Sequence, residues 1–585
     1  MTEVSTLETD ILVIGAGGAG LFAALHAHQA DPDLRIAVAV KGLLGKCGCT
    51  RMVQGGYNVA LGPGDSVERH FMDTIIGGKW LPHQGLAWKL VETAVVRVRE
   101  LENELGCFFD RNPDGSLHHK AFAGQTFDRT VHKGDLTGIE IINRLMERVR
   151  ALPLAGLEEH RVLGLIPDRA GERIAGALMV DMRSGEFRLV HARAVLLATG
   201  GGPTMYRYHT PSGDKSMDGL AMALRLGLPL RDMEMVQFHP TGLLAGRDTR
   251  MTGTVLEEGL RGAGGYLLNG TGDRFMLHHD PAGERATRDI VSRAIYDEMR
   301  RGRTSPLGGV YIAMSHLGPD TVAARFPGMV RRCADCGFDL AAGRVEVVPT
   351  AHYFMGGLVC DTETRTGIRG LHVAGEDAAG MHGANRLGGN GVANSTVFGG
   401  IAGEVMAADL GAEGRGRALP EPDRDAVDRE LARATRPLGR HGGNIHGIRE
   451  RLMDQMWTDV GIIRSRAGLE RGIAGTAGLR IELDPTGIGT RDLRFNLSWH
   501  DWLNLENLLD VSEGICRAAL SRENSRGAHY REDFTGTGDL ASSTFTVVQR
   551  ADDRLSVTQS PVAFTIVRPG ESLLEEQPSL PGATV

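Results

Sequence analysis

Residues 11–20 read Ile-Leu-Val-Ile-Gly-Ala-Gly-Gly-Ala-Gly, an apolar run that leads directly into a glycine turn. Residues 21–30 have the composition of a helix, and residues 35–40 (Arg-Ile-Ala-Val-Ala-Val) have the pattern of a second strand. Strand, glycine turn, helix and strand within about 30 residues are typical of dinucleotide-binding folds. The turn allows a pyrophosphate to approach the helix N-terminus, where backbone N–H groups favour an anion. The stretch therefore predicts an α/β fold built on a discontinuous Rossmann-like domain.

Two later segments, residues 194–202 and 371–376, repeat the pattern of a strand followed by glycine or an acidic residue. We expect both to join the same sheet, with Glu376 available to a ribose hydroxyl. The second strand ends at Lys41, where a nicotinamide site would carry an acidic residue, so a standard nicotinamide site is not expected. The predicted division is a nucleotide-binding domain (1–236 and 346–410), an inserted α+β domain (237–345), a helical domain (420–530) and a small C-terminal region (531–585).

The composition narrows the function class. Eighty glycines in 585 residues are about twice the usual share, which favours a large bound ligand approached closely by the backbone. A net charge of -8 argues against nucleic acid as a partner. Seven scattered cysteines fit a reducing compartment better than a disulfide framework, and no apolar run is long enough to span a membrane.

Histidine, arginine and glutamate residues recur in glycine-rich surroundings. They occur in Gln237-Phe-His239-Pro-Thr, Glu257-Glu258-Gly-Leu-Arg261, Thr287-Arg288-Asp, Ala-His352-Tyr and His382-Gly-Ala-Asn-Arg386. If these side chains converge, they form a cationic pocket for carboxylates, because arginine offers a bidentate fork and histidine a further donor.

These segments resemble the flavoprotein of the succinate dehydrogenase and fumarate reductase family, which includes L-aspartate oxidase. The likeness runs from about residue 9 to 534. Besides the motifs above, it is carried by Gln54-Gly55-Gly56, Phe122-Ala-Gly-Gln125, Asp218-Gly219, Leu387-Gly-Gly-Asn390 and Ser525-Arg-Gly-Ala-His529.

The resemblance implies an FAD-dependent oxidoreductase whose inserted domain caps the substrate. The cofactor contacts that it implies are Gly15, Gly17, Gly18, Gly20, Lys41, Cys49, Thr50, Gln54, Gly55, Gly56, Asp218, Glu376, Asn390, Gly391 and Val392. His239, His352 and Arg386 would bind the substrate carboxylates, and Phe122 would lie near the double bond. Hydride would pass between flavin N5 and one alkene carbon. Arg288 would exchange a proton at the other carbon, with Glu258 and Arg261 as its relay.

The first departure from the family pattern is Cys49, the residue before Thr50. At the position of Cys49 the complexed enzymes carry the histidine that is linked to the flavin. Non-covalent FAD is the simplest consequence, and a cysteinyl thioether or a spectator thiol are the alternatives. The resemblance associates the covalent link with succinate oxidation, so its loss favours alkene reduction or an oxidase.

A second departure is Glu257, which stands where the family has a threonine that touches a substrate carboxylate. Two like charges at about 4 Å repel by about 1 kcal/mol in water and by several in a shielded site. Three explanations are open: Glu257 turns away, Glu257 is protonated, or the substrate carries an amino or amide group at that end.

The leading hypothesis is therefore the interconversion of an unsaturated dicarboxylate and its saturated form, of the fumarate and succinate type. A soluble L-aspartate-oxidase-like enzyme and a flavin-bearing subunit without catalysis are the alternatives. The sequence holds no cluster or haem motif, so a separate iron-sulfur subunit or another electron carrier is expected. We expect a cytoplasmic protein, or one held at the inner face of the cytoplasmic membrane by partner subunits.

Overall fold

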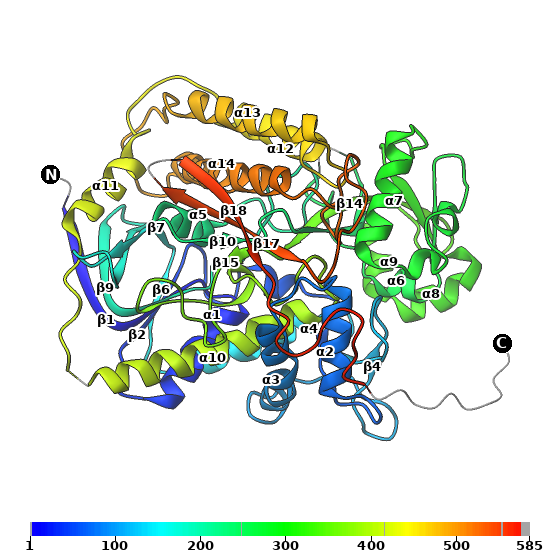
Figure 1. The fold of residues 1–585 in the computed structure, drawn as a ribbon, viewed down its shortest axis with the longest axis horizontal. Coiled ribbons are helices and arrows are strands. Elements are labelled where there is room, and N and C mark those ends of the chain that lie inside the picture. The colour runs from blue at the N-terminus through cyan, green and yellow to red at the C-terminus, as the bar shows by residue number, and fades with distance from the viewer. Residues whose placement is uncertain (1–2, 247–248, 415, 552–553, 575–585) are drawn as a thin grey trace.

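The computed structural model describes residues 3–246, 249–414, 416–551 and 554–574 (Figure 1). Within these residues the central sheet has seven strands, in the order β6-β2-β1-β9-β8-β7, with β16 also paired to β9. They are β1 (Val4–Ile14), β2 (Ile36–Val40), β6 (Ala155–Glu158), β7 (His160–Pro167), β8 (Ile174–Asp181), β9 (Phe187–Leu197) and β16 (Leu371–Val373). The pairs among β6, β2, β1, β9 and β16 are parallel, whereas β7 and β8 are antiparallel additions.

The apolar run at residues 11–14 is the buried half of β1, and Ile11, Leu12 and Val13 have no exposed surface. Such continuous apolar runs are typical of parallel strands covered on both faces. The second half of β9 pairs with β1 on one side and with β16 on the other. Both later strand segments therefore lie in the same sheet, as predicted, and the fold class is confirmed.

Two glycines make the turn between β1 and α1 (Gly18–Ala30). Gly15 has φ of 112°, and a Cβ there would lie 2.1 Å from the carbonyl oxygen of Ala198. A Cβ at Gly20 would lie 1.9 Å from the carbonyl oxygen of Gly15. Any side chain at either position would push the helix away from the sheet.

Helices cover the central sheet, and the long helix α10 is one of them. It packs on α1 and on α3, while α4 also contacts α1, α2 contacts α3, and α5 and α11 contact β7. Their bounds are α2 (Val67–Gly77), α3 (Gln84–Asn103), α4 (Thr137–Arg150), α5 (Asp218–Arg225), α10 (Asn390–Glu413) and α11 (Arg424–Thr435).

A second sheet with its own buried core stands to one side, in green at the right of Figure 1. We call this part, residues 236–354, the cap module. Its antiparallel strands are β11 (Val236–Leu243), β14 (Arg344–Phe354), β13 (Val310–Ala313) and β12 (Tyr266–Leu268). Its helices are α6 (Gly259–Gly262), α7 (Arg288–Arg300), α8 (Pro319–Arg325) and α9 (Pro327–Ala334). The exact domain boundaries given above stay predictions.

Three helices form a layer at the top of Figure 1: α12 (Ile445–Asp459), α13 (Arg466–Leu483) and α14 (Leu497–Ser521). Each begins at a side-chain cap, from Asn444, Ser465 and Asn496 respectively. Such caps stabilise a helix by satisfying N–H groups of its first turn. Trp499 and Trp502 of α14 have no exposed surface and anchor the layer.

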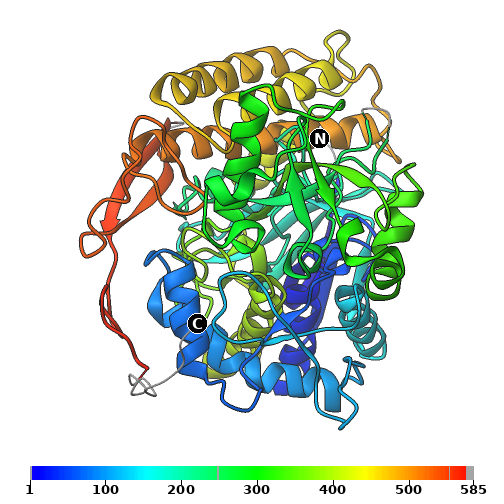
Figure 2. The same cartoon turned by 90° about the vertical axis from the view of Figure 1, so that its right-hand side faces the viewer.

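A further sheet has the strand order β15-β10-β17-β18. It consists of β10 (Leu230–Arg231), β15 (Gly357–Leu358), β17 (Thr544–Ala551) and β18 (Arg554–Pro561). The sequence pattern also indicates a strand over residues 562–567, and this prediction is wrong. That segment is an extended strap held by Gln84, whose side chain bonds the backbone of Ile566 and Val567 at 2.6–3.1 Å. Figure 2 shows it running toward α2 and α3. Residues 575–585 of the predicted C-terminal region lie outside the described residues.

The remaining elements are short. A three-stranded sheet consists of β3 (Tyr57–Asn58), β5 (Thr130–Val131) and β4 (His119–Lys120). The single-turn helices are η1 (Cys49–Met52), η2 (Phe275–His278), η3 (Gly283–Arg285), η4 (Ser315–Leu317) and η5 (Gly375–Asp377). Among the helices of the described ranges, none is long and apolar enough to cross a membrane.

Candidate active site

One continuous cavity of about 510 Å³ extends from the glycine turn after β1 to Arg288 in the cap module. Its walls come from segments spread between Ile14 and Ser395, which belong both to the part built on the central sheet and to the cap module. The volume is that of a site for a large organic ligand. The cavity has two chemically different ends, one lined by glycines and helix N-termini and one lined by charged side chains.

At the glycine-lined end, two helices begin at a glycine, which has no side chain to cap the helix. α1 starts after Gly17 and α10 after Gly389, and both starts reach the cavity, through Gly17 and Gly18 and through Gly391 and Val392. The Gly18 N–H donates to Thr50 Oγ1 at 3.0 Å. A Cβ at Gly17 would meet only one atom within 4 Å, so this turn leaves room for a ligand. Uncapped N–H groups and the helix dipoles fit the phosphates and carbonyl oxygens of a dinucleotide.

Four charged residues lie at the same end: Lys41, Arg161, Asp218 and Glu376. Lys41 Nζ donates to Asp218 Oδ2 at 2.8 Å, and Arg161 Nη2 reaches the other oxygen at 3.2 Å. Burial would raise the pKa of Asp218, but the two cations outweigh it and hold that pKa well below its ordinary value. Glu376 Oε1 accepts the N–H of Phe354 at 2.8 Å, and burial raises the pKa of Glu376 to about 7. Lys41 is therefore engaged in an ion pair, while Glu376 faces the cavity.

Most of the predicted cofactor residues lie on the cavity wall: Gly15, Gly17, Gly18, Lys41, Cys49, Thr50, Gln54, Gly55, Gly56, Asp218, Glu376, Gly391 and Val392. Gly20 and Asn390 lie behind the wall. Asn390 is fully buried, where its Oδ1 accepts from Asn58 Nδ2 at 2.8 Å and lies 3.0 Å from His70 Nε2. It holds the start of α10 in place from within the core.

At the charged end, His239 of β11 and His352 of β14 lie with their ring centroids 5.4 Å apart. His239 Nδ1 accepts the N–H of Thr241 at 3.3 Å, and His352 Nδ1 lies 3.0 Å from the Thr210 hydroxyl. Burial, followed by the nearby Arg288 guanidinium, lowers the pKa of both imidazoles well below the ordinary value. Both rings are therefore neutral at pH 7, and each keeps one N–H to donate.

Arg288, the first residue of α7, is fixed from two sides. Its Nε and Nη2 donate to Glu258 Oε2 at 2.9 and 2.5 Å, and its Nη1 donates to Gln237 Oε1 at 3.0 Å. Arg261 Nη2 lies 3.5 Å from the second Glu258 oxygen. Burial alone would raise the pKa of Glu258, but Arg288 and Arg261 hold it below its ordinary value. The three side chains form a continuous charged row, of which Arg288 and Glu258 line the cavity and Arg261 lies behind them.

Arg386 and Phe122 complete this end from the side of the central sheet. The Arg386 guanidinium lies 4.4 Å from the centre of the Tyr353 ring, and its Nη1 donates to the Leu387 carbonyl at 3.2 Å. Its buried Nε has no hydrogen-bond partner among the described residues. Burial and the nearby Arg288 lower the pKa of Arg386 to about 10, so it stays charged at pH 7. An unpartnered guanidinium N–H in an enclosed cationic pocket fits a carboxylate ligand.

Comparison with known proteins agrees with this geometry. Residues 10–392 match a family model described as an FAD binding domain, and residues 449–574 match one described as the fumarate reductase flavoprotein C-terminus. One subunit of the fumarate reductase (CoM/CoB) from Methanothermobacter marburgensis is 39% identical over 92% of this chain and 96% of its own length. The fumarate reductase flavoprotein subunit of Escherichia coli is 34% identical over 97% of this chain and 96% of its own.

The chain belongs to the fumarate reductase and succinate dehydrogenase flavoprotein family. A solved structure of Escherichia coli quinol fumarate reductase superposes with a TM-score of 0.91 at 33% identity, covering 97% of this chain and 99% of that one. The protein is thus an FAD-dependent oxidoreductase, and the glycine-lined end of the cavity fits its FAD.

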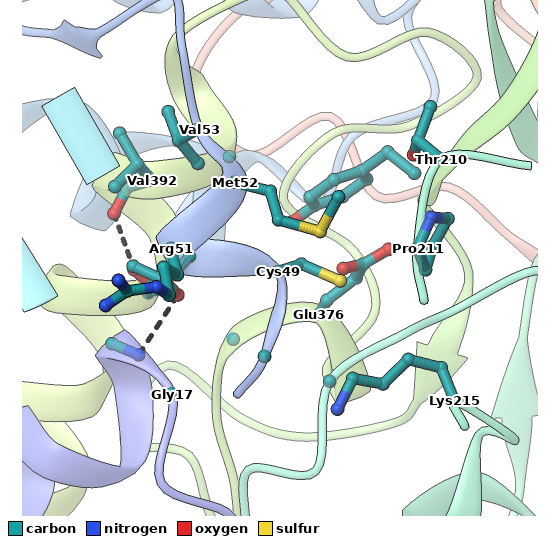
Figure 3. Close-up of a pocket in the computed structure, with 18 of the residues that line it drawn as sticks. Gly17, Cys49, Arg51, Met52, Val53, Thr210, Pro211, Lys215, Glu376 and Val392 are labelled. Carbon is teal, nitrogen blue, oxygen red and sulfur yellow. Dashed lines mark hydrogen bonds between the residues drawn. The ribbon is translucent and has the colours of Figure 1, made fainter. Parts of the chain in front are cut away.

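Cys49 of this flavoprotein lies in η1 on the cavity wall. Figure 3 shows its sulfur pointing toward the carboxylate of Glu376, with Lys215 and Met52 nearby. Burial, with Glu376 adding to it, raises the pKa of the Cys49 thiol to about 12. Because the thiolate is the reactive form of cysteine, this environment opposes covalent attachment of the flavin.

We therefore predict that FAD is held without a covalent bond. Acid precipitation of the holoprotein is expected to leave the yellow flavin in the supernatant, for the wild type and for Cys49→Ala alike. The measurement is flavin absorbance in the pellet and the supernatant. Flavin that stays with the wild-type pellet but is released from Cys49→Ala would contradict the prediction.

Two residues without a predicted role belong to the charged end. Gln237, quoted above only as part of a motif, holds Arg288. Lys120 of β4 stands in none of the motifs, yet its Nζ donates to Glu257 Oε1 at 2.6 Å. Glu257 lines the cavity and is 4% exposed. No sequence signal marks Lys120, because Lys120 and Glu257 are far apart in the chain and meet only through the packing of β4 against the cap module.

Proposed function

We propose that this flavoprotein interconverts an unsaturated C4 dicarboxylate of the fumarate type and its saturated form. The observation that carries the proposal is the row formed by Arg288, Glu258 and Arg261, which ends in a cavity also lined by Arg386 and two neutral histidines. A cationic pocket with a fixed guanidinium on the wall suits a substrate that carries two carboxylates and accepts one proton. The family names of the relatives support the same chemistry.

In this proposal, Arg386, His239 and His352 bind the carboxylates. Arg386 offers its free Nε, and each neutral histidine offers one N–H. Phe122, which is 8% exposed and lines the cavity, covers the alkene and excludes water from it. Exclusion of water strengthens each of these polar contacts.

FAD, when bound, supplies the hydride acceptor or donor. Arg288 donates a proton to the substrate carbon that does not receive the hydride, or removes it in the reverse direction. Guanidinium groups are weak acids, but an alkene carbon that gains negative charge is a strong base in a water-free site. Glu258 is ionised and lies within 4 Å of both arginines, so it can accept a proton from Arg261 and pass it to the deprotonated Arg288, after which Arg261 takes up a proton from solvent.

We further propose that the chain works as one subunit of a complex and exchanges electrons with an iron-sulfur subunit or another carrier. Two of the relatives are named as subunits, and the Escherichia coli neighbour is titled a quinol fumarate reductase. Any position at the inner face of the cytoplasmic membrane would then depend on such partners.

The proposal favours fumarate over an amino dicarboxylate such as L-aspartate. The reason to expect an amino group was the unopposed charge of Glu257, and Lys120 offsets that charge.

The test is a pair of assays on the holoenzyme. We expect fumarate to oxidise a reduced viologen dye under anaerobic conditions, and L-aspartate with oxygen to form no peroxide. Peroxide from aspartate without dye oxidation by fumarate would reverse the assignment, and binding of both without turnover would indicate a subunit without catalysis.

A further inference from the structure

Glu257 is a carboxylate on the wall of a cavity end that otherwise binds anions. Its side chain is 5% exposed, and it lies next in sequence to Glu258 of the charged row. An isolated buried carboxylate there would repel a dicarboxylate substrate strongly, because the enclosed site screens charges poorly.

The structure supplies Glu257 with one close cation. Lys120 Nζ lies 2.6 Å from Glu257 Oε1 and donates also to the carbonyl oxygen of Gly134 at 2.9 Å. Lys120 belongs to β4 of the three-stranded sheet and Glu257 to the segment just before α6 of the cap module, so the ion pair joins these two parts of the molecule at the cavity. Lys120 is also two residues before Phe122, which lines the same cavity.

Two further charged groups face Glu257. Asp135, between β5 and α4, and Arg332, on α9, both line the cavity and act on Glu257 in opposite directions. Their formal charges sum to zero. Burial raises the pKa of Glu257 above its ordinary value, and Lys120 is the strongest opposing influence. Without Lys120, no cation of the described residues would lie within 4 Å of the Glu257 carboxylate, although Arg332 acts on it from farther away.

The net charge at the charged end of the cavity shows how the ion pair between Lys120 and Glu257 affects substrate binding. Arg261, Arg288 and Arg386 carry three positive charges and Glu258 one negative charge, which leaves an excess of two. This excess matches a doubly charged dicarboxylate only while the Glu257 charge is cancelled. Removing Lys120 would lower the excess to one.

We propose that Lys120 is a positioning residue for substrate selection, which holds Glu257 in a neutral ion pair so that the cavity accepts a doubly charged dicarboxylate. The inference rests on the proposed function, since it concerns the same site. Lys120 acts through Glu257 rather than by contact with the substrate.

The test is a binding titration that needs no turnover. Malonate, a dicarboxylate without an alkene, is added to the oxidised holoenzyme, and the change in the flavin spectrum gives Kd between pH 6 and 8.5. For Lys120→Met we expect a Kd on the order of 10²-fold weaker than wild type at pH 8, from one unopposed charge. The loss should shrink as the pH falls, because burial raises the pKa of Glu257 and its protonation removes the unopposed charge.

Three further variants separate charge from structure. The double variant Lys120→Met with Glu257→Gln restores the neutral wall and should bind within about fivefold of wild type, without the new pH dependence. Glu257→Gln alone leaves Lys120 unpaired and should tighten binding. Lys133→Met, on a neighbouring half-exposed lysine paired with Asp110, is the matched control and should leave Kd unchanged.

Each outcome bears on the inference. Wild-type affinity in Lys120→Met at pH 8, or a double variant as weak as the single one, would overturn it and leave the proposed function standing. If Lys120→Met fails to fold, unchanged or weaker binding in Glu257→Gln overturns it as well. If neither malonate nor fumarate perturbs the wild-type flavin, the proposed function itself fails and the inference fails with it.

Discussion

Replacing Arg288 with glutamine is expected to lower the rate of fumarate reduction by about 10³-fold or more, while the protein still folds and holds FAD. Loss of a general acid costs about 10²–10⁴-fold, and the lost positive charge adds to this. Glutamine keeps a hydrogen-bonding side chain opposite Glu258 and Gln237 but cannot supply the proton. The measurement is anaerobic turnover with a reduced dye, at saturating fumarate, so that kcat is separated from KM.

Arg293 provides the matched control for this variant. It lies on the same helix, α7, but its guanidinium stacks over Tyr530 at 4.5 Å, outside the cavity. Arg293→Gln should keep nearly full activity. A kcat for Arg288→Gln within tenfold of wild type would show that Arg288 only binds substrate, and the proton would then have another source.

The second large effect concerns stability. Arg129 has no exposed surface, and its guanidinium donates to both oxygens of Asp65 at 2.9–3.0 Å and to Asp73 at 2.6 Å. Arg129→Met would leave two buried carboxylates without their cation, which costs about 3–5 kcal/mol. Asp73 also accepts from the backbone and hydroxyl of Thr126, close to Phe122, so the loss should loosen the cavity wall as well.

Denaturant unfolding of the holoprotein, followed by circular dichroism and by flavin fluorescence, measures this effect. The midpoint for Arg129→Met should fall clearly below that of wild type by both probes. The control is Arg144→Met on α4, an exposed arginine whose partner Glu147 is exposed and whose partner Glu140 is partly exposed. Such exposed pairs contribute about 0–1 kcal/mol, so its midpoint should hardly change. Equal midpoints for the two variants would contradict the role given to Arg129.

The sequence predicts the local parts of this fold well. The glycine turn between β1 and α1 is specified by short-range sterics, because Gly15 and Gly20 tolerate no side chain. The apolar runs of β1, β9 and β16 indicate buried parallel strands for the same local reason. The strap at residues 562–567 shows the limit. Its apolar residues look like a strand, but Gln84, nearly 500 residues away in the chain, takes up its backbone hydrogen bonds.

The candidate site also has parts that the sequence predicts and parts that depend on long-range packing. Its motif residues are recognisable because each stands in a characteristic short segment, and nearly all of those segments line one cavity. The partners of these residues are not recognisable in this manner. Lys120 sits in an unremarkable stretch, and its pairing with Glu257 depends on how two sheets pack. Gly20 and Asn390 illustrate the reverse case, since both belong to motifs yet support the wall from behind.

The most direct measurement is a single turnover of the reduced flavoprotein. The holoenzyme is reduced chemically without oxygen, excess reductant is removed, and fumarate is added while the flavin spectrum is recorded. We predict rapid return of the oxidised spectrum, with one succinate formed per flavin, and slow return for Arg288→Gln. A flavin that stays reduced in fumarate, yet reoxidises at once in oxygen, would contradict the account.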